Sequence, residues 1–174
     1  MKYLIVVDMQ NDFISGSLGS KDAEKTVDAV CRKINEYKNE NCRIFVTLDT
    51  HGEDYLSTEE GKNLPVVHCV KGSEGWKNDK RIEKALDGKG EYFEKNTFGS
   101  VRLAQTLSQI IQEGDTVELC GLCTDICVVS NALLIRAFCP ETEIYVDGKC
   151  CAGVTKEKHF SALETMKSCQ IKVL

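Results

Sequence analysis

The run Tyr3-Leu4-Ile5-Val6-Val7, which stops at Asp8, is apolar throughout and rich in β-branched residues. Short continuous apolar runs of this kind predict strands that are buried on both faces, as in parallel sheets. Similar runs follow at residues 43–48, 91–94, 116–119, 143–146 and 171–173. The sequence therefore predicts about six buried strands.

Helical spacing separates these runs. Two segments repeat apolar residues every three or four positions: Val27, Val30, Ile34 and Tyr37 in one, and Leu103, Leu107, Ile110 and Ile111 in the other. Ser20 and Ser100 precede them as expected N-caps, and Gly114 follows the second as an expected C-cap. Strands that alternate with helices indicate an α/β protein, a three-layer α/β/α arrangement with a Rossmann-like parallel sheet.

Three further segments carry specific expectations. Residues 126–138 are apolar on nearly every side, which predicts a helix buried almost all round. Residues 156–167 predict a last helix with Phe160, Leu163 and Met166 on one buried face. Residues 50–90 break the alternation and exceed the usual length of a connection, so we expect a functional loop there.

Length and composition limit the class of protein. The 174 residues, 42% of them hydrophobic, suit a single domain over residues 1–174. The net charge of −5 is spread without a basic block, which argues against a nucleic-acid partner. The first apolar run is far shorter than the roughly 18 residues of a membrane span, and too short for a signal peptide. Ten cysteines fall short of a disulfide scaffold, so we expect reduced thiols and a cytoplasmic protein.

Chemically active side chains follow four of the expected strands. Asp8 ends the first, Asp49 with His51 ends the second, Lys95 ends the third, and Cys127 follows the fourth across the turn at residues 121–125. Ligands bind at the carboxyl ends of strands in open parallel sheets. These residues are therefore expected to meet at one edge of the sheet.

Cys127 is the expected nucleophile of this group. It would lie in a first helical turn capped by Thr124 or Asp125, where free N–H groups and the helix dipole favour a thiolate. Asp8 can take the thiol proton and return it to a leaving amine, while Lys95 holds both groups. His159 falls in the last helix and is expected at the surface, which argues against a Cys-His or Ser-His-Asp arrangement.

A second constellation surrounds the long loop. Asp49, His51 and His68 offer one carboxylate and two imidazoles, a set that can hold a divalent metal ion. A further ligand could come from the loop's acidic residues, Glu53, Asp54, Glu59 and Glu60. Cys120, Cys123 and Cys127 could also suggest zinc or a redox pair, but Cys120 is expected to face the core.

The chain also contains a series of motifs in order: Val6-Val7-Asp8-Met9-Gln10-Asn11-Asp12-Phe13, Asp49-Thr50-His51, Lys95-Asn96-Thr97-Phe98 and Gly121-Leu122-Cys123-Thr124-Asp125-Ile126-Cys127. Over nearly its whole length it resembles the isochorismatase-like cysteine hydrolases. The pattern D-x-H followed by E-G-K-N-L-P-V-V-H-C narrows the resemblance to the nicotinamidases. It implies an isochorismatase-like fold.

The resemblance also implies roles for individual residues. Cys127 would be the nucleophile, Asp8 the proton acceptor and donor, and Lys95 the orienting cation. A cis peptide between Leu122 and Cys123 would aim the N–H groups of Cys123 and Cys127 at the oxyanion. Four residues would bind a divalent metal, zinc above all: Asp49, His51, Glu60 and His68. Glu59, one residue away from Glu60, is the alternative fourth ligand. Phe13 and Phe98 would contact the substrate ring.

The implied activity is hydrolysis of nicotinamide to nicotinate and ammonia through a cysteine thioester, a step of NAD salvage, without an organic cofactor. Oligomers are usual for the family, so a homo-oligomer is implied as well. The first alternative is a cysteine amidase of the same superfamily that acts on another small amide, ureido or carbamoyl compound. Isochorismatase, a vinyl ether hydrolase, fits less well because its members lack the nucleophilic cysteine. A non-enzymatic alternative is a zinc-binding or thiol-rich scaffold built on Cys120, Cys123 and Cys127.

Overall fold

The computed structural model describes residues 1–39 and 42–174. Its centre is a sheet of six parallel strands in the order β3-β2-β1-β4-β5-β6. The strands are β1 (Lys2–Val7), β2 (Cys42–Asp49), β3 (Gly90–Lys95), β4 (Thr116–Leu122), β5 (Glu143–Ala152) and β6 (Lys172–Val173). The six expected strands are confirmed, and β4 and β5 extend further than expected at their carboxyl ends.

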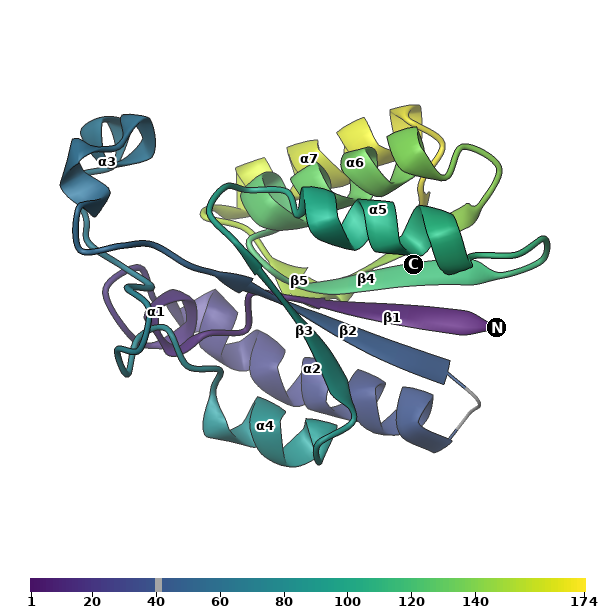
Figure 1. Ribbon diagram of the computed structural model, residues 1–174, viewed down its shortest axis with the longest axis horizontal. Coiled ribbons are helices and arrows are strands. Elements are labelled where there is room, and N and C mark those ends of the chain that lie inside the picture. Colours follow the sequence, from purple (N-terminus) through teal and green to yellow (C-terminus); the bar gives the residue numbers. More distant parts are fainter. Residues whose placement is uncertain (40–41) are drawn as a thin grey trace.

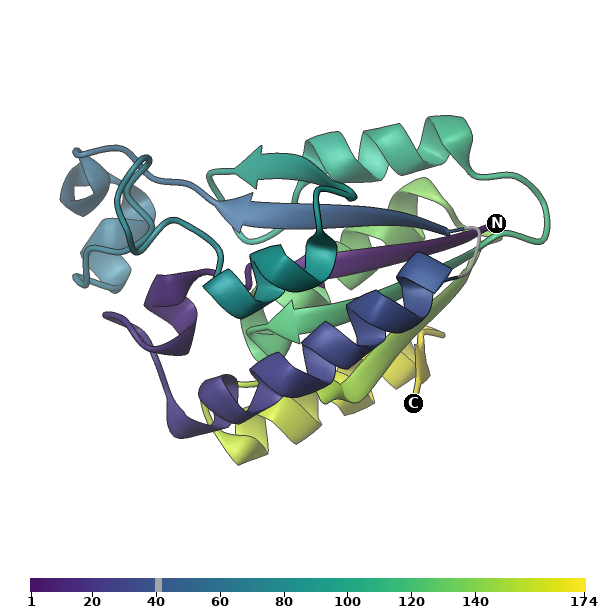
Figure 2. The same ribbon diagram turned by 90° about the horizontal axis from the view of Figure 1, so that it is seen from below.

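Helices cover both faces of the sheet (Figures 1 and 2). One face carries α2 (Lys21–Asn39) and α4 (Lys80–Leu86), and the other carries α5 (Val101–Ile110), α6 (Val129–Phe138) and α7 (Lys156–Ser168). This is the expected three-layer α/β/α fold. Shorter helices lie beyond the carboxyl ends of the strands: α1 (Asn11–Ile14), η1 (Tyr55–Ser57) and α3 (Glu59–Asn63).

The pleat of β1 explains why both faces are covered. Leu4 and Val6 pack among residues of α2 and α4, whereas Tyr3, Ile5 and Val7 pack among residues of α5, α6 and α7. Successive side chains of a strand point to opposite faces, so an unbroken apolar run supplies two cores at once. Both cores are buried, which fixes β1 in the middle of the sheet.

The strand order places β1 between β2 and β4. The chain first adds β2 and β3 on one side of β1, and then adds β4, β5 and β6 on the other side. In the register, Val7 lies beside Thr47 on one side and Gly121 on the other, and Asp49 lies beside Lys95. The carboxyl ends of β1, β2, β3 and β4 therefore meet at one edge. This is the kind of switch point at which open parallel sheets bind ligands.

Helix starts agree with the sequence better than helix ends. The Ser20 hydroxyl accepts a hydrogen bond from Ala23 N–H at 3.0 Å, and Ser100 accepts one from Leu103 N–H at 3.2 Å, so both expected N-caps are confirmed. Gly114 as a C-cap is wrong. The helix ends at Ile110, and Gly114 lies in the following turn with φ at +84°.

Three other expectations need correction. The segment 126–138 starts as a π-helical turn, η2 (Thr124–Val128), and α6 is not buried all round, because Phe138 is 38% exposed. In α7, Leu163 and Met166 are buried, but Phe160 is 62% exposed. Residues 50–90 contain η1, α3 and α4 rather than one long loop. Among the described residues, every helix is too short or too polar to cross a bilayer.

Candidate active site

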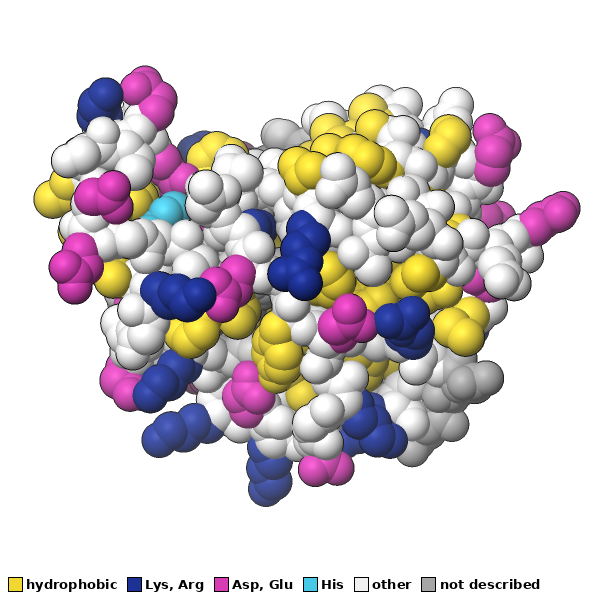
Figure 3. Space-filling model, viewed as in Figure 1, with side chains coloured by type: hydrophobic (Ala, Val, Ile, Leu, Met, Phe, Trp, Pro, Cys, Tyr) yellow, Lys and Arg dark blue, Asp and Glu magenta, His cyan; other side chains and the backbone are white. Residues whose placement is uncertain are grey.

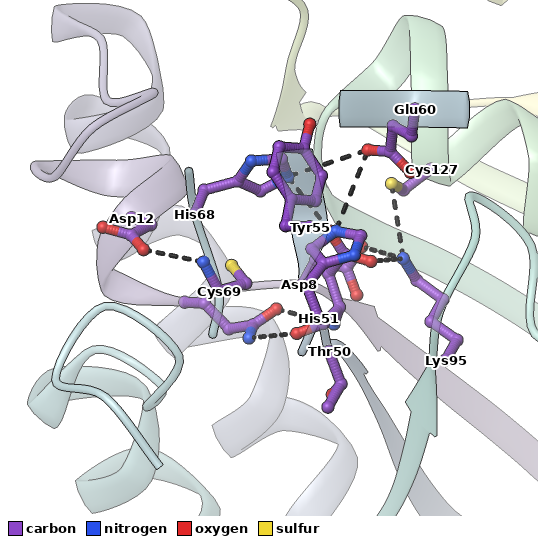
Figure 4. A network of polar contacts seen from close by, with 12 residues as sticks. Asp8, Asp12, Thr50, His51, Tyr55, Glu60, His68, Cys69, Lys95 and Cys127 are labelled. Carbon is purple, nitrogen blue, oxygen red and sulfur yellow. Dashed lines mark hydrogen bonds and ion pairs between the residues drawn. The ribbon is translucent and has the colours of Figure 1, made fainter. Parts of the chain in front are cut away.

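Asp8, Lys95 and Cys127 meet beyond the carboxyl ends of the strands (Figure 4). The Lys95 ammonium lies between the other two, with Nζ 2.7 Å from Asp8 Oδ2 and 3.5 Å from Cys127 Sγ. All three side chains are buried. The structure thus brings together the three residues that the sequence placed after three different strands.

Local contacts fix the position of Asp8. Its backbone has φ at +46°, a left-handed conformation that Asp tolerates better than most residues. The Thr47 hydroxyl of the neighbouring strand donates to Asp8 Oδ1 at 2.6 Å, and Asp8 N–H donates to the Thr47 carbonyl at 3.2 Å. One carboxylate oxygen therefore faces Thr47 while the other faces Lys95.

Burial governs the protonation of the thiol. It raises the pKa of Cys127 well above its ordinary value, and the Asp8 carboxylate raises it further, while Lys95 opposes both. The expectation that the helix start favours a thiolate is therefore wrong. Burial also raises the pKa of Asp8 against the opposing influence of Lys95. The raised pKa of Cys127 favours the neutral thiol, and the raised pKa of the neighbouring Asp8 carboxylate increases its affinity for the thiol proton.

His51, Glu60 and His68 lie beside the first group (Figure 4), and together with Asp49 they form a second group. Each offers one ligand atom, and all four atoms lie within 4.8 Å of one another. Asp49 Oδ2 lies 3.0 Å from His51 Nε2 and 3.4 Å from His68 Nε2, and Glu60 Oε1 lies 3.8 Å and 3.7 Å from the same nitrogens. Asp49 comes from β2, and the other three come from the segment that follows it.

The chemistry of this group fits a divalent metal ion. Two imidazoles and two carboxylates are ligands that zinc accepts. His68 Nδ1 lies 2.7 Å from the Val66 carbonyl, so it is positioned to donate there and leave Nε2 directed at the other ligand atoms. This outer hydrogen bond is typical of metal-bound histidines. Burial and Asp49 raise the pKa of Glu60, as expected for two carboxylates that converge without an ion between them.

The structure distinguishes Glu60 from its neighbours. The Glu59 side chain is 84% exposed and pairs with Lys62, whereas the Glu60 side chain is 18% exposed and faces the histidines. Glu53 and Asp54 are exposed and lie outside the group. Within residues 1–39 and 42–174, Cys120, Cys123 and Cys127 form no metal-binding group either, and Cys120 is buried in the core as expected.

Several residues that support the two groups were assigned no role from the sequence. Gln10 is fully buried, and its side chain forms hydrogen bonds of 2.8 Å to both the N–H and the carbonyl of Asp49. Asp12 accepts a 2.8 Å hydrogen bond from Cys69 N–H, next to His68. The Tyr55 ring, also fully buried, packs against both histidine rings at 4.7 and 4.9 Å. Gln10 and Asp12 lie in the quoted motif, but the motif does not reveal what their side chains contact.

A pocket of about 400 Å³ lies over these groups. Its lining includes Cys127, Cys123, Asp49 and His68, together with Phe13 and Phe98. Phe13 is 8% exposed and its ring lies 5.6 Å from that of His68, whereas Phe98 is 42% exposed. In Figure 3 the α3 region stands out from the rest of the molecule, and a histidine side chain is visible beside it.

The peptide bond between Leu122 and Cys123 is cis, in agreement with the resemblance. It leads directly into η2, where the N–H groups of Ile126 and Val128 both donate to the Cys123 carbonyl, at 3.1 and 3.0 Å. His159, which is expected at the surface, lies in α7 as predicted and makes a side-chain contact there. It is half-buried, with Nδ1 2.8 Å from Thr124 Oγ1.

Comparisons with known proteins agree with this geometry. The model of the Isochorismatase domain family matches residues 2–174. A nicotinamidase/pyrazinamidase of Mycobacterium tuberculosis is 29% identical over 190 residues, which cover 100% of this chain and 98% of that protein. A pyrazinamidase of Pyrococcus horikoshii, solved in complex with zinc, and a nicotinamidase of Bacillus subtilis are 27% and 25% identical, with TM-scores of 0.81 and 0.84. Both alignments cover 99% of this chain and 98% of the other.

Proposed function

The chain belongs to the Isochorismatase domain family and is an amidohydrolase related to the nicotinamidases, and on this premise we propose that it hydrolyses nicotinamide to nicotinate and ammonia. The observation that carries the proposal is the contact of Lys95 with both Asp8 and Cys127 beside a pocket that is also lined by metal-ligand candidates. A nucleophile, a proton carrier and an anchor for a pyridine ring then face the same space.

The reaction would begin with proton transfer from Cys127 to Asp8. The sulfur attacks the amide carbon, and a C–S bond forms as the carbonyl π electrons move to oxygen. Asp8 then gives its proton to the amide nitrogen, the C–N bond breaks and ammonia leaves. In the second half, Asp8 takes a proton from water, whose oxygen displaces the thiolate from the thioester. Asp8 returns that proton to the sulfur, which restores the thiol, and the acid product loses its own proton and leaves as nicotinate.

Lys95 and the backbone would supply the electrostatics. The Lys95 ammonium stays charged, because the Asp8 carboxylate raises its pKa despite burial. It stabilises each anionic partner as negative charge moves between Asp8 and Cys127. The N–H groups of Cys123 and Cys127 would receive the oxyanion of the tetrahedral intermediates. Removing one such donor typically costs ~10²–10³ in turnover.

The second group would hold the substrate ring. Asp49, His51, Glu60 and His68 would bind a divalent ion, with zinc as the first candidate, which when bound would accept the pyridine nitrogen and orient the carboxamide toward Cys127. Phe13 and Phe98 would contact the two faces of the ring. No organic cofactor enters these steps. The proposal places the reaction in cytoplasmic NAD salvage, which the ten free cysteines support. A homo-oligomer stays a prediction.

The test is ammonia release from nicotinamide by the metal-loaded protein, compared with Cys127→Ala and Cys169→Ala. Cys169 is a half-buried cysteine at the end of α7, far along the chain from the site, and serves as the matched control. We expect Cys127→Ala to lose all measurable turnover and Cys169→Ala to keep it. Wild-type protein that releases no ammonia would refute the substrate, and an active Cys127→Ala would refute the mechanism.

The pocket volume favours one second candidate. About 400 Å³ lies within the ~300–1,000 Å³ range of pockets for drug-sized ligands, so larger amides could also enter. A panel of small amides, ureido and carbamoyl compounds, assayed with and without chelator, separates the two activities. Turnover that prefers nicotinamide and depends on metal supports the first, whereas metal-independent turnover of another amide supports the second.

A further inference from the structure

His159 and Thr124 form a contact that the proposed chemistry leaves unexplained. Thr124 is fully buried and joins Cys123 to the π-helical turn that carries Cys127. Its hydroxyl lies 2.8 Å from Nδ1 of His159, which belongs to α7, 35 residues further along the chain. Among the described residues that line the substrate pocket, neither His159 nor Thr124 appears. The two side chains therefore lie outside the lining of the pocket.

The segment that leads into α7 also contacts the next residue of the turn, Asp125. Val154 N–H donates to Asp125 Oδ1 at 2.9 Å, so consecutive residues of the turn are tied to one segment, residues 153–159. This segment is packed tightly against the turn. A Cβ at Gly153 would lie 2.8 Å from Asp125 Oδ1 and 2.9 Å from His159 Cα, closer than real side chains approach. The turn has little space to move toward α7, and two hydrogen bonds resist its moving away.

The position of the turn decides where the oxyanion donors point. Cys123 precedes Thr124 directly, and its carbonyl accepts from Ile126 and Val128 within the turn. A displacement of Thr124 would move the Cys123 N–H with it. Displacements of ~1 Å can cost ~10²-fold in rate when they misplace a group that acts on the reacting atoms. Of the two ties, the one through Val154 uses backbone N–H, whereas the one through His159 depends on a side chain that can be removed.

We propose that His159 is a positioning residue, which through its hydrogen bond to Thr124 holds the Cys123 N–H where the oxyanion develops. This inference rests on the proposed amide hydrolysis. The anchoring of α7 does not depend on the imidazole, because Leu163 and Met166 are buried in the core. Removing the imidazole should thus affect the oxyanion site without undocking the helix.

The test separates ground-state binding from oxyanion binding. Pyridine-3-carbaldehyde adds the Cys127 thiol across its C=O bond, so that a C–S bond forms and the former carbonyl oxygen occupies the oxyanion site. Nicotinate binds without that bond. In His159→Ala we expect kcat for nicotinamide to fall about 10-fold with KM within about 2-fold, because the interaction lost is made in the transition state. The affinity for the aldehyde should fall by a similar factor, and the affinity for nicotinate should not change.

Three further single variants and one double variant isolate the hydrogen bond. Asn at 159 can place a polar atom where Nδ1 lies, so His159→Asn should recover a large part of kcat. Phe160→Ala removes the exposed ring that packs on His159 at a centroid distance of 5.1 Å but keeps the hydrogen bond, so it should match wild type. Thr124→Val should lower kcat by the same factor as His159→Ala, and the double variant should be no worse than either.

The outcomes that overturn the inference are distinct from those that overturn the proposed function. Wild-type kcat in His159→Ala, or equal losses of affinity for aldehyde and nicotinate, contradicts the positioning role. If His159→Ala does not fold, as judged by circular dichroism and thermal melting, Thr124→Val carries the same comparison. A wild-type protein that releases no ammonia refutes the function, while the aldehyde and nicotinate affinities still decide the role of His159. Wild-type protein that does not bind the aldehyde contradicts both.

Discussion

The Lys95 ammonium is the residue-scale feature that connects the two halves of the site. Its Nζ lies 2.7 Å from Asp8 and 3.2 Å from Asp49 Oδ1, so it serves the proposed proton carrier and a candidate metal ligand together. Two buried carboxylates around a single ammonium leave a net negative charge. Such a surplus favours a divalent cation nearby, because buried charges are stable only when they are paired.

Thr47 provides a test of the charge on Asp8. The hydroxyl of Thr47 donates to the carboxylate at 2.6 Å and lowers its pKa, although burial outweighs this and raises the pKa overall. Asp8 must be ionised to accept the thiol proton, so activity is lost as the pH falls through this pKa. Thr47→Val removes the donor, which raises the pKa further. We expect the acidic limb of kcat/KM to move to higher pH by about 1 unit, or about 1.4 kcal/mol.

The control for this measurement is Thr47→Ser, which keeps the hydroxyl and should keep the wild-type limb. The pH dependence of kcat/KM for nicotinamide, measured on all three proteins, decides the matter. A limb in Thr47→Val that stays in place, or moves to lower pH, shows that the hydroxyl does not stabilise the ionised form of Asp8.

At this scale the sequence predicted positions well and contacts poorly. Asp8, Asp49 and Lys95 could be placed together because Asp49 and Lys95 end their strands and Asp8 directly follows its strand. The carboxyl ends of neighbouring parallel strands share an edge of the sheet. Gln10 and Tyr55 could not be assigned, because their partners depend on which way a loop folds back. The protonation of Cys127 was predicted in the wrong direction, because its burial is a property of the folded surroundings.

Strand β4 leads into the turn that carries Cys127, and Gly121 near the end of β4 has no space for a side chain. Gly121 has φ at +119° and lies beside Val7 in the register. A Cβ there would overlap the Val7 carbonyl oxygen and lie 2.8 Å from the Val7 nitrogen. Any side chain at this position would therefore push β4 away from β1, immediately before Asp8.

Gly121→Ala should cost more than about 3 kcal/mol of unfolding free energy, since it combines a strained φ with a backbone overlap. Gly114→Ala is the matched control, because Gly114 also has positive φ, +84°, but its Cβ would meet nothing within 4 Å. It should cost only about 1–2 kcal/mol. Urea denaturation of both variants measures the difference, and equal losses would show that contact with β1 is not the cause.

The elements also show where periodicity misleads. The six strands and both N-caps followed from local patterns, because burial on two faces and capping are local requirements. The apolar residues of 126–138 indicated a helix buried almost all round, yet Phe138 is partly exposed. Phe160 of the last helix, α7, is exposed as well. A pattern records which residues are apolar, but not whether the fold provides another layer to cover them.

At the scale of the whole molecule, the four candidate metal ligands connect the segment after β2 to the sheet. His51, Glu60 and His68 belong to that segment, whereas Asp49 belongs to the sheet itself. An ion that binds only the folded arrangement stabilises it by mass action, by about 4 kcal/mol at 1,000 times its dissociation constant. For a chain of this size that corresponds to a rise in Tm of roughly 10 °C.

We therefore expect chelator to lower Tm and added zinc to restore it. In His51→Ala the difference between chelated and zinc-loaded protein should largely disappear. Asp54→Ala, which removes an exposed carboxylate from the same segment, should keep the full difference. Differential scanning fluorimetry of the three proteins is sufficient. A zinc-dependent shift that survives in His51→Ala would assign the binding to other residues.

The strand order has a consequence for how the protein acquires its activity. Asp8, Asp49, Lys95 and Cys127 come from the ends of β1, β2 and β3 and from the turn after β4, all joined side by side. Such pairings link distant parts of the chain, and a high contact order slows refolding. During refolding from denaturant, helical signal can return early, but catalysis can return only once β4 has joined β1. Recovery of turnover thus times the completion of the central sheet.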